Sequence, residues 1–549
     1  MLLSVRVSSR LFLNRGGSSL FVRSFSQVPS WASVDPFTMS AASPAQSQNL
    51  LDGNWFSSPQ SKTIVDPLNG DAFLQVPDVV SSELDPWVES MKRCSKTGLH
   101  NPLKNVERYI MYGRVCRDAA EELKKPETAL FFQKLIQRVV PKHDKQAFGE
   151  VNTVRSWLES YAGDNVRDLA RSFALPGDHA GQSTQGYRFP YGPVSVITPF
   201  NFPLEIPSLQ TLSALFMGNK PLVKVDEKVA VVMEQFVRML IHCGMPAEDL
   251  NYLYSSGPVA NELLIRFDCR MTLFTGSQAV AERLCNDMRG RVKLEDAGFD
   301  WKILGPDVQD EEFVVWQCDQ DAYGFSGQKC SAQSILFVHE NWAKTNIVKK
   351  LGDRAALRSL NDLTICPVIT WNNEKISNHI ADLLKIPGAH VAFGGKPVAT
   401  PHSIPECYGS FEPTAIFVPI EEAVKEEHFP TVVRELFGPL QVITEFSDTQ
   451  LPHVLDMCER MTNHLTAAIV SNDRKFCNTV LASTVNGTTY SGIRARTTGA
   501  PQQHWFGPAG DPRSGGIHTR EAIQLVWSGH REIIYDEIVP DGWTAPKAT

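Results

Sequence analysis

Between residues 193 and 297 the sequence alternates between short β-rich runs and longer runs with helical periodicity. Strands are predicted at 194–199, 221–225, 251–254, 270–274 and 292–294, and helices at 206–217, 229–243, 259–267 and 279–288. Such alternation is typical of a parallel sheet whose connecting helices cover both faces. The sequence therefore predicts a doubly wound α/β fold, in which ligands bind at the carboxyl ends of the strands.

The flanking segments extend this organisation. Residues 80–165 are predicted to be mostly helical, with Pro126 opening one helix, and a second α/β-alternating region runs from Cys330 to about residue 490. The stretch 498–516 is dense in glycine and proline and is predicted to be a loop. Residues 533–539 are predicted to form an edge strand.

Composition excludes several classes of protein. A chain of 549 residues is expected to fold as two or three domains. Its net charge of −8 argues against binding of nucleic acid or of an anionic membrane. No apolar run reaches the roughly 18 to 20 residues that span a bilayer, so no membrane insertion is expected. The eleven cysteines form no CxxC pair, which argues against a disulfide framework and against a metal site.

The first 34 residues have a composition of their own. They contain four arginines and nine serines, and no acidic residue precedes Asp35. This predicts an organellar transit peptide at 1–34, and the spacing of the arginines, which gives a basic amphipathic helix, favours a mitochondrial one. We therefore expect the mature protein in the mitochondrial matrix. Chloroplast import and a merely disordered tail remain the alternatives.

Cys330 is the candidate nucleophile. It lies in the run Gly-Gln-Lys-Cys-Ser (327–331), 35 positions after Glu295 in the run Val-Lys-Leu-Glu (292–295). A thiol flanked by small and polar residues is accessible, and its thiolate attacks carbon readily. A nearby carboxylate can act as general base on the thiol or on water. Spacing alone leaves open that Glu295 is a solvated acid at a strand end.

Two further segments occur in the same chain, Pro-Phe-Asn-Phe-Pro (199–203) and Glu-Leu-Phe-Gly-Pro (435–439). Together with the runs around Cys330 and Glu295 they resemble the signature of the NAD(P)-dependent aldehyde dehydrogenase superfamily, over about residues 50–545. The resemblance implies the three-part fold of that family, assembled as a homodimer or homotetramer. Its parts would be an NAD-binding domain at 45–166 and 188–297, an α/β catalytic domain at 298–516, and a small oligomerisation domain at 167–187 and 517–549.

The resemblance also implies a covalent mechanism acting on a small-molecule aldehyde. Cys330 would attack the aldehyde, and the side-chain amide of Asn201 with the backbone N–H of Cys330 would stabilise the oxyanion. Hydride would pass to nicotinamide, and Glu295 would activate the water that hydrolyses the thioester. Without the resemblance, Asn201 is equally well explained as a turn residue between a strand and a helix.

The family pattern assigns a set of cofactor-binding residues as well. Lys224 and Glu227 would hold the adenosine ribose, and a carboxylate there favours NAD over NADP because it repels a 2′-phosphate. Gly276 and Ser277 resemble the turn that meets the pyrophosphate at a helix start, although Ala281 stands where a second glycine is common. The remaining predicted cofactor contacts are Pro199, Phe200, Glu435 and Phe437.

A closer resemblance concerns the runs 328–331 and 294–302. They are similar to family members of plant mitochondria that oxidise L-glutamate γ-semialdehyde to L-glutamate in proline catabolism. This implies Ser331 at the substrate carboxylate and, less directly, Glu150 near the substrate ammonium. Phe202, Ala509 and Gly510 complete the predicted substrate set. Pro508 has no N–H to donate, which leaves open which backbone groups hold the carboxylate.

Three other functions compete with this one. An aldehyde dehydrogenase for another semialdehyde or for an aliphatic aldehyde would carry the same signature. A cysteine hydrolase would need a histidine beside Cys330, and none of the fourteen histidines lies in a recognisable motif for that role. A non-catalytic binding protein would have no use for the full set of Asn201, Glu295, Cys330 and Glu435.

Overall fold

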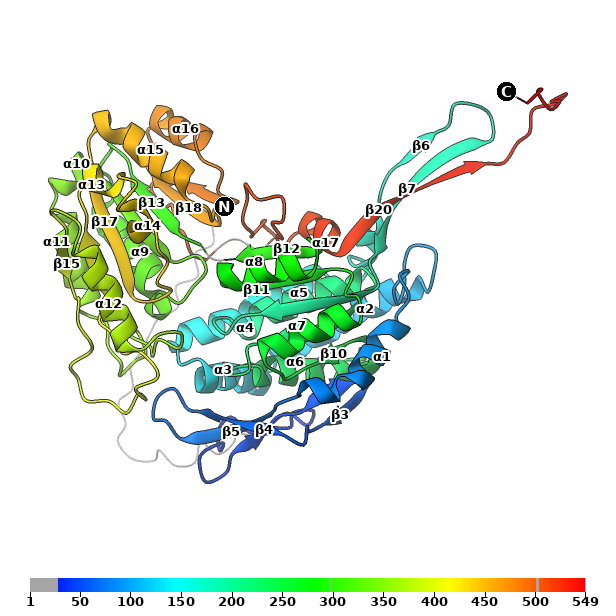
Figure 1. Cartoon of the computed structure of the whole chain (residues 1–549), viewed down its shortest axis with the longest axis horizontal. Coiled ribbons are helices and arrows are strands. Elements are labelled where there is room, and N and C mark those ends of the chain that lie inside the picture. The colour runs from blue at the N-terminus through cyan, green and yellow to red at the C-terminus, as the bar shows by residue number, and fades with distance from the viewer. Residues whose placement is uncertain (1–27, 297, 500–502, 549) are drawn as a thin grey trace, which may run out of the picture.

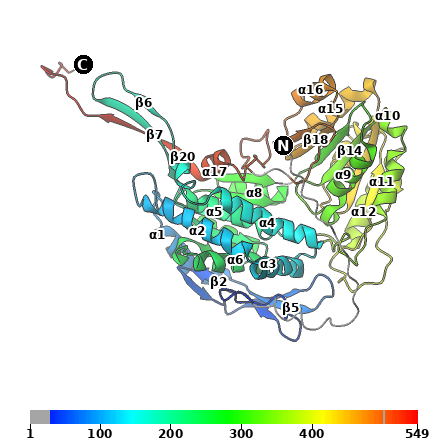
Figure 2. The same cartoon turned by 180° about the vertical axis from the view of Figure 1, so that it is seen from behind.

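The computed structural model describes residues 28–296, 298–499 and 503–548. Two α/β lobes lie side by side, and a narrow arm of strands projects from one of them (Figures 1 and 2). No helix in the described part of the chain combines the length and the apolar character that crossing a bilayer requires. The predicted α/β class is confirmed.

The first lobe is built on a seven-stranded sheet with the order β12-β11-β8-β9-β10-β2-β3. The parallel strands are β8 (Pro193–Thr198), β9 (Lys220–Val225), β10 (Asn251–Tyr252), β11 (Thr272–Gly276) and β12 (Val292–Asp296), and β2 (Asn49–Leu51) and β3 (Asn54–Phe56) add an antiparallel edge. The connecting helices are α5 (Glu205–Phe216), α6 (Val231–His242), α7 (Gly257–Arg266) and α8 (Gln278–Asp287). The predicted alternation is thus confirmed segment by segment.

The strand order reverses between β8 and β11. From β8 the chain proceeds through β9 to β10 on one side, and β11 and β12 are added on the other. Loops at the carboxyl ends of two such strands diverge and leave a crevice, which is where open α/β sheets bind their ligands. Pro199 follows β8 directly and Gly276 ends β11, so two of the predicted motifs flank this crevice.

The N-terminal part of the chain covers the same lobe. Its helices are α1 (Asp85–Arg93), α2 (Glu107–Lys124), α3 (Pro126–Val139) and α4 (Asp144–Ser160), with short 3-10 turns at Ser81–Glu83, Arg167–Ala170 and Ala247–Asp249. Pro126 occupies the first turn of α3, where its missing N–H leaves no intrahelical hydrogen bond unmade. A small sheet of β1 (Ala45–Gln46), β5 (Ala72–Pro77) and β4 (Ser61–Val65) lies below these helices in Figure 1.

The second lobe repeats the architecture with the strand order β15-β16-β17-β14-β13-β18-β19. Its strands are β13 (Asp300–Leu304), β14 (Gln333–His339), β15 (His390–Phe393), β16 (Thr414–Phe417), β17 (Leu440–Phe446), β18 (Thr466–Val470) and β19 (Thr488–Ser491). All pairs are parallel except β15 with β16. The helices are α9 (Glu311–Tyr323), α10 (Glu340–Ala343), α11 (Ile347–Ala355), α12 (Asn373–Leu383), α13 (Ile420–Ala423), α14 (Phe429–Val432), α15 (Leu451–Arg460) and α16 (Arg474–Ala482), with 3-10 turns at Gly324–Gly327 (η4) and Asp448–Gln450.

The arm is a three-stranded antiparallel sheet of β20, β7 and β6. β6 (Ala174–Pro176) and β7 (Gln182–Pro190) form a hairpin, and β20 (Ser528–Asp536) follows α17 (Arg520–Trp527). β20 pairs with β7 along its whole length, from Ser528 opposite Pro190 to Asp536 opposite Gln182. The predicted C-terminal strand at 533–539 therefore exists but is shifted toward the N-terminus, and β20 forms one edge of the sheet as predicted.

Part of the predicted leader belongs to the folded body. Residues 1–27 lie outside the described residues, but Trp31 packs against Phe131 and Phe132 of α3 at ring-centroid distances of 5.4 and 5.6 Å. The Trp31 indole N–H also donates a hydrogen bond to Glu122 (3.2 Å), and the Ser33 amide donates to Gln235 (2.9 Å). Residues 31 and 33 thus contact the folded body, and the predicted end of the leader at residue 34 stays a prediction.

Phe216 joins three helices of the first lobe. Its ring, at the end of α5, is fully buried and stacks on Trp157 of α4 at 5.6 Å, next to Tyr161 at 5.5 Å and Tyr112 of α2 at 6.0 Å. Such aromatic contacts stabilise a core beyond the area that they bury. Because α4 and α5 both carry residues of the candidate site, this cluster also fixes the site's framework.

Phe216→Ala should lower the free energy of unfolding by about 3–5 kcal/mol, because it leaves a cavity that the surrounding helices cannot fill. Thermal denaturation measures the loss as a fall in Tm. Phe148→Ala on α4 is the matched control, since that ring is 48% exposed and its removal should cost less than about 0.5 kcal/mol. Equal shifts in the two variants would contradict the role given to Phe216.

Candidate active site

Two cavities meet at Cys330. The first, which we call the sheet-edge cavity, has a volume of about 560 Å³ and lies at the carboxyl ends of β8, β9 and β11. The second, the inner cavity, has a volume of about 350 Å³ and lies beneath α4 and the start of α5. Among the residues that the structure describes, Cys330 is the one that lines both. A ligand in either space therefore reaches the same thiol.

Most of the predicted site residues line these cavities. Those in the sheet-edge cavity are Pro199, Phe200, Asn201, Lys224, Gly276, Ser277, Glu295, Glu435 and Phe437. Those in the inner cavity are Glu150, Phe202 and Ser331. Motifs that lie up to 287 positions apart in the sequence, from 150 to 437, thus converge on the Cys330 thiol.

The loop before Cys330 has an unusual backbone conformation. Phe325 and Ser326 adopt φ angles of 57° and 49°, and Gly327 follows at 70°. A Cβ on Gly327 would lie 2.1 Å from the carbonyl oxygen of Gly438, so only glycine fits. Non-glycine residues in the left-handed region carry strain that surrounding contacts must hold, and such residues concentrate at functional sites.

A neighbouring loop supplies those contacts. The Ser326 hydroxyl donates to the Cys366 carbonyl (3.2 Å) and accepts from the Cys366 amide (2.8 Å). The Gln328 side chain donates to the Pro367 carbonyl (2.9 Å) and accepts from the Ile369 amide (2.8 Å). The loop before Cys330 is therefore fixed by buried hydrogen bonds to the segment 366–369, which holds Cys330 at the junction of the cavities.

The surroundings of Cys330 favour the neutral thiol over the thiolate. Burial raises its pKa well above the ordinary value, and the charge of Glu295 is the next largest cause. Asp300 adds to the effect, and the Glu295 carboxylate also hydrogen-bonds to the thiol. A thiol in these surroundings reacts only when its proton is taken, and Glu295 is the carboxylate placed to take it.

Asn201 is placed as a hydrogen-bond donor beside the thiol. Its side chain is 1% exposed and it lines the sheet-edge cavity with Cys330 and Glu295. Its backbone carbonyl accepts a hydrogen bond of 2.8 Å from Lys142 Nζ. That bond fixes the backbone of the turn after β8 and leaves the side-chain amide for a ligand. An amide N–H next to a nucleophile can stabilise an oxyanion that forms there.

Lys142 is the centre of a buried cluster of polar contacts with Glu150, Asn201 and the start of α5. Sequence analysis missed this cluster, which we call the brace. Its ammonium pairs with Glu150 Oε2 at 3.1 Å, and both side chains are at most 1% exposed. Glu150 Oε1 accepts from the amides of Leu204 (2.8 Å) and Glu205 (3.1 Å) at the start of α5. Glu150 thus lies in the inner cavity's wall as predicted for a substrate residue, but its carboxylate is committed to Lys142 and α5.

Two aromatic rings complete the brace. Lys142 Nζ lies 4.6 Å from the ring centroid of Phe202 and 4.6 Å from that of Phe325. A desolvated cation over such rings gains about 2 kcal/mol or more. Phe202 follows Asn201 in the sequence, and Phe325 lies in the loop that leads to Cys330. The Lys142 ammonium therefore connects α4 both to Asn201 and to the Cys330 loop.

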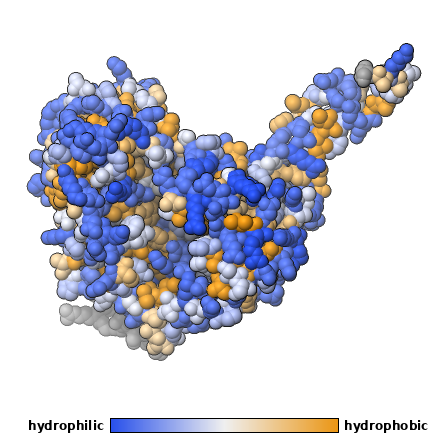
Figure 3. All heavy atoms as spheres, in the orientation of Figure 1, coloured by the Kyte–Doolittle hydropathy of each residue, from blue (hydrophilic) through white to orange (hydrophobic). Residues whose placement is uncertain are grey.

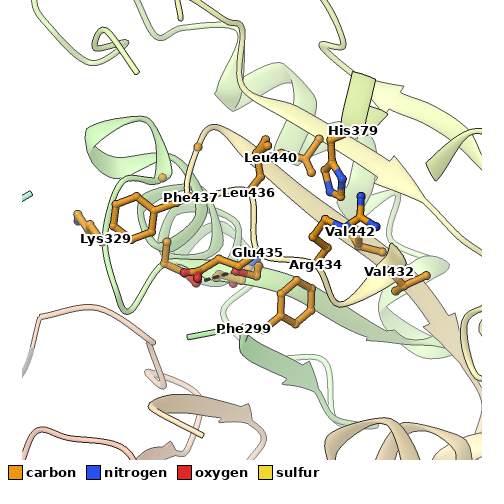
Figure 4. A pocket seen from close by; sticks show the side chains of 15 residues that line it. Phe299, Lys329, His379, Val432, Arg434, Glu435, Leu436, Phe437, Leu440 and Val442 are labelled. Atoms are coloured by element: carbon orange, nitrogen blue, oxygen red, sulfur yellow. Dashed lines mark hydrogen bonds between the residues drawn. The ribbon is translucent and has the colours of Figure 1, made fainter. Parts of the chain in front are cut away.

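The segment Arg434–Phe437 closes the sheet-edge cavity from the second lobe. Phe437 packs edge-on against Phe200 at 5.9 Å, joining the two lobes across the cavity. Behind it lies a space of about 10 Å³, enough for one water molecule, which Figure 4 shows with Glu435, Phe437, Phe299 and Lys329 around it. Glu435 lines both spaces and is therefore accessible to a ligand in the larger one.

Three predicted contacts are not brought to a cavity. Glu227 pairs with Lys62 of β4 at 3.1 Å and does not line the sheet-edge cavity, although Lys224 does. The Ala509 amide donates to the His464 carbonyl (3.1 Å), and Gly510 is exposed. The loop around Pro508 does not line the inner cavity, and its Ala509 N–H pairs with the second lobe instead.

The inner cavity is lined by other residues instead of Ala509 and Gly510. Among them, Lys142, Glu205, Thr498, His504 and His518 carry polar side chains that sequence analysis did not assign. Lys142 lies eight positions before Glu150, and this spacing gave no signal because Lys142 precedes α4 whereas Glu150 lies within it. His504 lies in the Gly/Pro-rich loop 498–516 and His518 lies just after it, and local sequence patterns do not determine the path of such a region.

A thiol at the junction of two cavities, with a carboxylate beside it, is the arrangement expected of an enzyme that uses a cysteine nucleophile. The chain belongs to the aldehyde dehydrogenase family, whose model matches residues 55–522. It is 56% identical over 521 residues, 94% of each chain, to Delta-1-pyrroline-5-carboxylate dehydrogenase 12A1, mitochondrial, of Arabidopsis thaliana. It is 55% identical over 536 residues, 97% of each chain, to a probable aldehyde dehydrogenase of Linum usitatissimum.

Solved structures share the fold. Betaine aldehyde dehydrogenase of Staphylococcus aureus in complex with NAD+ matches with a TM-score of 0.78 at 19% identity, over 95% of this chain and 100% of that one. Methylmalonate-semialdehyde dehydrogenase of Oceanimonas doudoroffii matches with a TM-score of 0.77 at 18% identity, over 90% of this chain and 99% of that one. The predicted aldehyde dehydrogenase fold is confirmed.

Lys142→Met should lower kcat by about 10- to 100-fold, because Asn201 loses the bond that fixes its backbone. It should also destabilise the protein by about 3–5 kcal/mol, because Glu150 is left buried without its cation. The double variant Lys142→Met/Glu150→Gln separates the two effects: Tm should recover in part, and kcat should not.

Lys145→Met, on the exposed side of α4, is the matched control and should leave both Tm and kcat unchanged. Steady-state kinetics and thermal denaturation of the four proteins provide the comparison. A double variant with wild-type kcat would show that the brace serves stability alone.

Proposed function

We propose that this protein is an NAD-dependent L-glutamate γ-semialdehyde dehydrogenase that works in the mitochondrial matrix. The observation that carries the chemistry is the Cys330 thiol beside the Glu295 carboxylate at the junction of two cavities. The substrate and the compartment rest on the 56% identity to the Arabidopsis enzyme, over nearly the whole of both chains. Oxidation of another semialdehyde or of an aliphatic aldehyde is the alternative.

NAD fits the sheet-edge cavity. The cavity lies at the topological switch of the sheet, and its floor is the start of α8, where Ser277 makes no side-chain cap bond. The N–H groups of that first turn are therefore free of a cap and face an anion such as a pyrophosphate favourably. Lys224 and Glu435 would hold ribose hydroxyls, with Phe200 and Phe437 beside the ring. NAD supplies the hydride acceptor when bound.

The chain's own residues perform the remaining steps. Glu295 takes the thiol proton of Cys330, and the sulfur then forms a bond to the aldehyde carbon. The carbonyl oxygen becomes an oxyanion, which the Asn201 amide and the Cys330 backbone N–H stabilise. After the hydride has left, the acyl group remains on sulfur as a thioester. Glu295 releases its first proton to solvent and then takes a proton from water, whose oxygen attacks the thioester; the departing sulfur takes that proton, and the acid and the thiol are released.

The exposed arm supports the proposal of a homodimer or homotetramer. Both edge strands of the arm, β20 and β6, lack a partner strand on their outer side within the described chain. Large apolar side chains are exposed along the arm and the tail beyond it (Figure 3): Phe173, Leu175, Ile534, Ile538, Val539 and Trp543. Open edges and apolar surface of this kind are normally covered in a soluble protein, and a second copy of the chain is the proposed cover.

Cys330→Ala should abolish aldehyde oxidation and leave the affinity for NAD within about threefold, because the cofactor contacts lie on other residues. Glu295→Gln should retain the first hydride transfer better than thioester hydrolysis, so NADH should appear as a burst equal to the enzyme concentration. The two measurements are NADH absorbance in stopped flow and NAD titration. Steady turnover by Cys330→Ala would overturn the mechanism, and a wild-type steady rate in Glu295→Gln would remove that residue from it.

Ile534→Asp on β20 should shift the protein to a smaller species in size-exclusion chromatography with light scattering, because it places a charge in the proposed interface. Leu357→Asp is the control, since Leu357 is 77% exposed on the second lobe, far along the chain from the arm. Its elution should match the wild type. A monomeric wild-type protein would refute the proposed assembly.

A further inference from the structure

The inner cavity contains a polar cluster that the mechanism does not use. Glu205, His504 and His518 line the cavity together. His518 Nε2 lies 3.8 Å from Glu205 Oε1, and the two imidazole rings are 5.2 Å apart. His518 is 7% exposed, and its Nδ1 is buried without a hydrogen-bond partner among the described residues. A buried polar atom left unsatisfied in a cavity wall indicates a ligand that completes it.

Tertiary contacts hold His518 in a backbone conformation of raised energy. His518 has a φ of 79°, in the left-handed region. Its carbonyl accepts hydrogen bonds from the Trp157 indole (3.2 Å) and the Tyr161 hydroxyl (3.0 Å), both on or next to α4. The next residue, Thr519, caps α17 through its side chain. A non-glycine residue fixed in this region at a cavity wall is the pattern expected of a binding residue.

Glu205 is fixed just as firmly. It is the first residue of α5, and its amide donates to the buried carboxylate of Glu150 (3.1 Å). The side chain therefore starts from a rigid point beside the brace, and its carboxylate is part of the cavity wall. The rest of the wall near the thiol is largely apolar, with Phe202, Phe325 and Ile517. Such a wall suits a short methylene chain with charged groups at its far end.

We propose that Glu205 and His518 together bind the amino-acid end of the substrate, with Glu205 at the α-ammonium and His518 at the α-carboxylate. This inference rests on the proposed function and names the residues that give it specificity. A carboxylate next to an imidazole N–H matches the two groups on one carbon of an amino acid. Ala509 and Gly510 were predicted to bind the substrate, but they do not line the cavity. Glu205 and His518 are proposed to bind it in their place.

Lys329 is the other cation of the inner cavity and, besides Ser331, a competing partner for the carboxylate. It belongs to the nucleophile's own loop, and burial lowers its pKa to about 8. Its Nζ lies against Gly324, 2.9 Å from where a Cβ would stand, and Gly324 is the C-cap of α9. A cation at that position stabilises the negative end of the helix dipole. This contact accounts for Lys329 without a substrate.

The test compares three aldehydes of matched chain length. L-Glutamate γ-semialdehyde has both charged groups, 5-oxopentanoate lacks the ammonium, and 4-aminobutanal lacks the carboxylate. The enzymes are the wild type, Glu205→Gln, His518→Asn and Lys329→Gln, with His453→Asn on the exposed side of α15 as control. Asparagine is chosen because it tolerates the left-handed region. Ratios of kcat/KM between aldehydes are compared, since a general loss of activity cancels in a ratio.

Glu205→Gln should reduce the preference for the glutamate semialdehyde over 5-oxopentanoate at least tenfold. It should change the preference over 4-aminobutanal by less than threefold. His518→Asn should show the opposite pattern, and His453→Asn should leave both ratios at the wild-type values. In both variants the loss of kcat/KM on the glutamate semialdehyde should come from a rise in KM more than from a fall in kcat. This is expected when binding that is shared by ground state and transition state is lost.

The outcomes separate the two proposals. A wild-type enzyme without preference for the glutamate semialdehyde would refute the proposed function. A wild-type enzyme with that preference, together with unchanged ratios in Glu205→Gln and His518→Asn, would overturn the assignment of the amino-acid end alone. Loss of the carboxylate preference in Lys329→Gln but not in His518→Asn would also overturn it, in favour of the lysine.

Discussion

One buried ammonium, that of Lys142, connects the parts of the active site. It pairs with Glu150 of α4 in the wall of the inner cavity and donates a hydrogen bond to the carbonyl of Asn201. It also lies 4.6 Å from the ring centroids of Phe202 and Phe325. Burying an ion pair is costly unless hydrogen bonds satisfy both partners. Here they do, because Glu150 also receives two amides at the start of α5. The buried pair thereby fixes the position of Asn201, the proposed oxyanion donor.

The second lobe uses the same device. Lys302 and Asp321 are both fully buried, with Nζ and Oδ2 2.6 Å apart. The Asp321 carboxylate also accepts from the Thr497 amide (2.9 Å) and the Thr498 hydroxyl (2.7 Å). Thr498 lines the inner cavity, so this pair fixes the loop that closes it. Each lobe thus secures one side of the inner cavity with a satisfied buried ion pair, and the reacting groups lie between two rigid supports.

Local patterns predicted the elements well and the cavities less well. Hydrophobic periodicity gives the strands and helices between residues 193 and 297, because each is decided by neighbours in sequence. Glu227 shows where such reasoning ends. It lies three positions after Lys224, yet a lysine of a different sheet, Lys62, binds its carboxylate. His518 is a second case, since its place in the inner cavity depends on α4 and α17, which meet only in the folded chain.

The division into two cavities explains why a family with one chemistry accepts different aldehydes. The residues of the sheet-edge cavity come from strand ends whose positions the sheet itself determines. Those of the inner cavity come from helices and from the loop region after β19, which the sheet does not constrain. Because Cys330 is the lining residue common to both among the described residues, we expect that changes in the inner cavity can alter the aldehyde without disturbing the cavity proposed for the cofactor. We therefore expect substrate choice in this chain to depend on α4, α5 and the described residues 498–499 and 503–518.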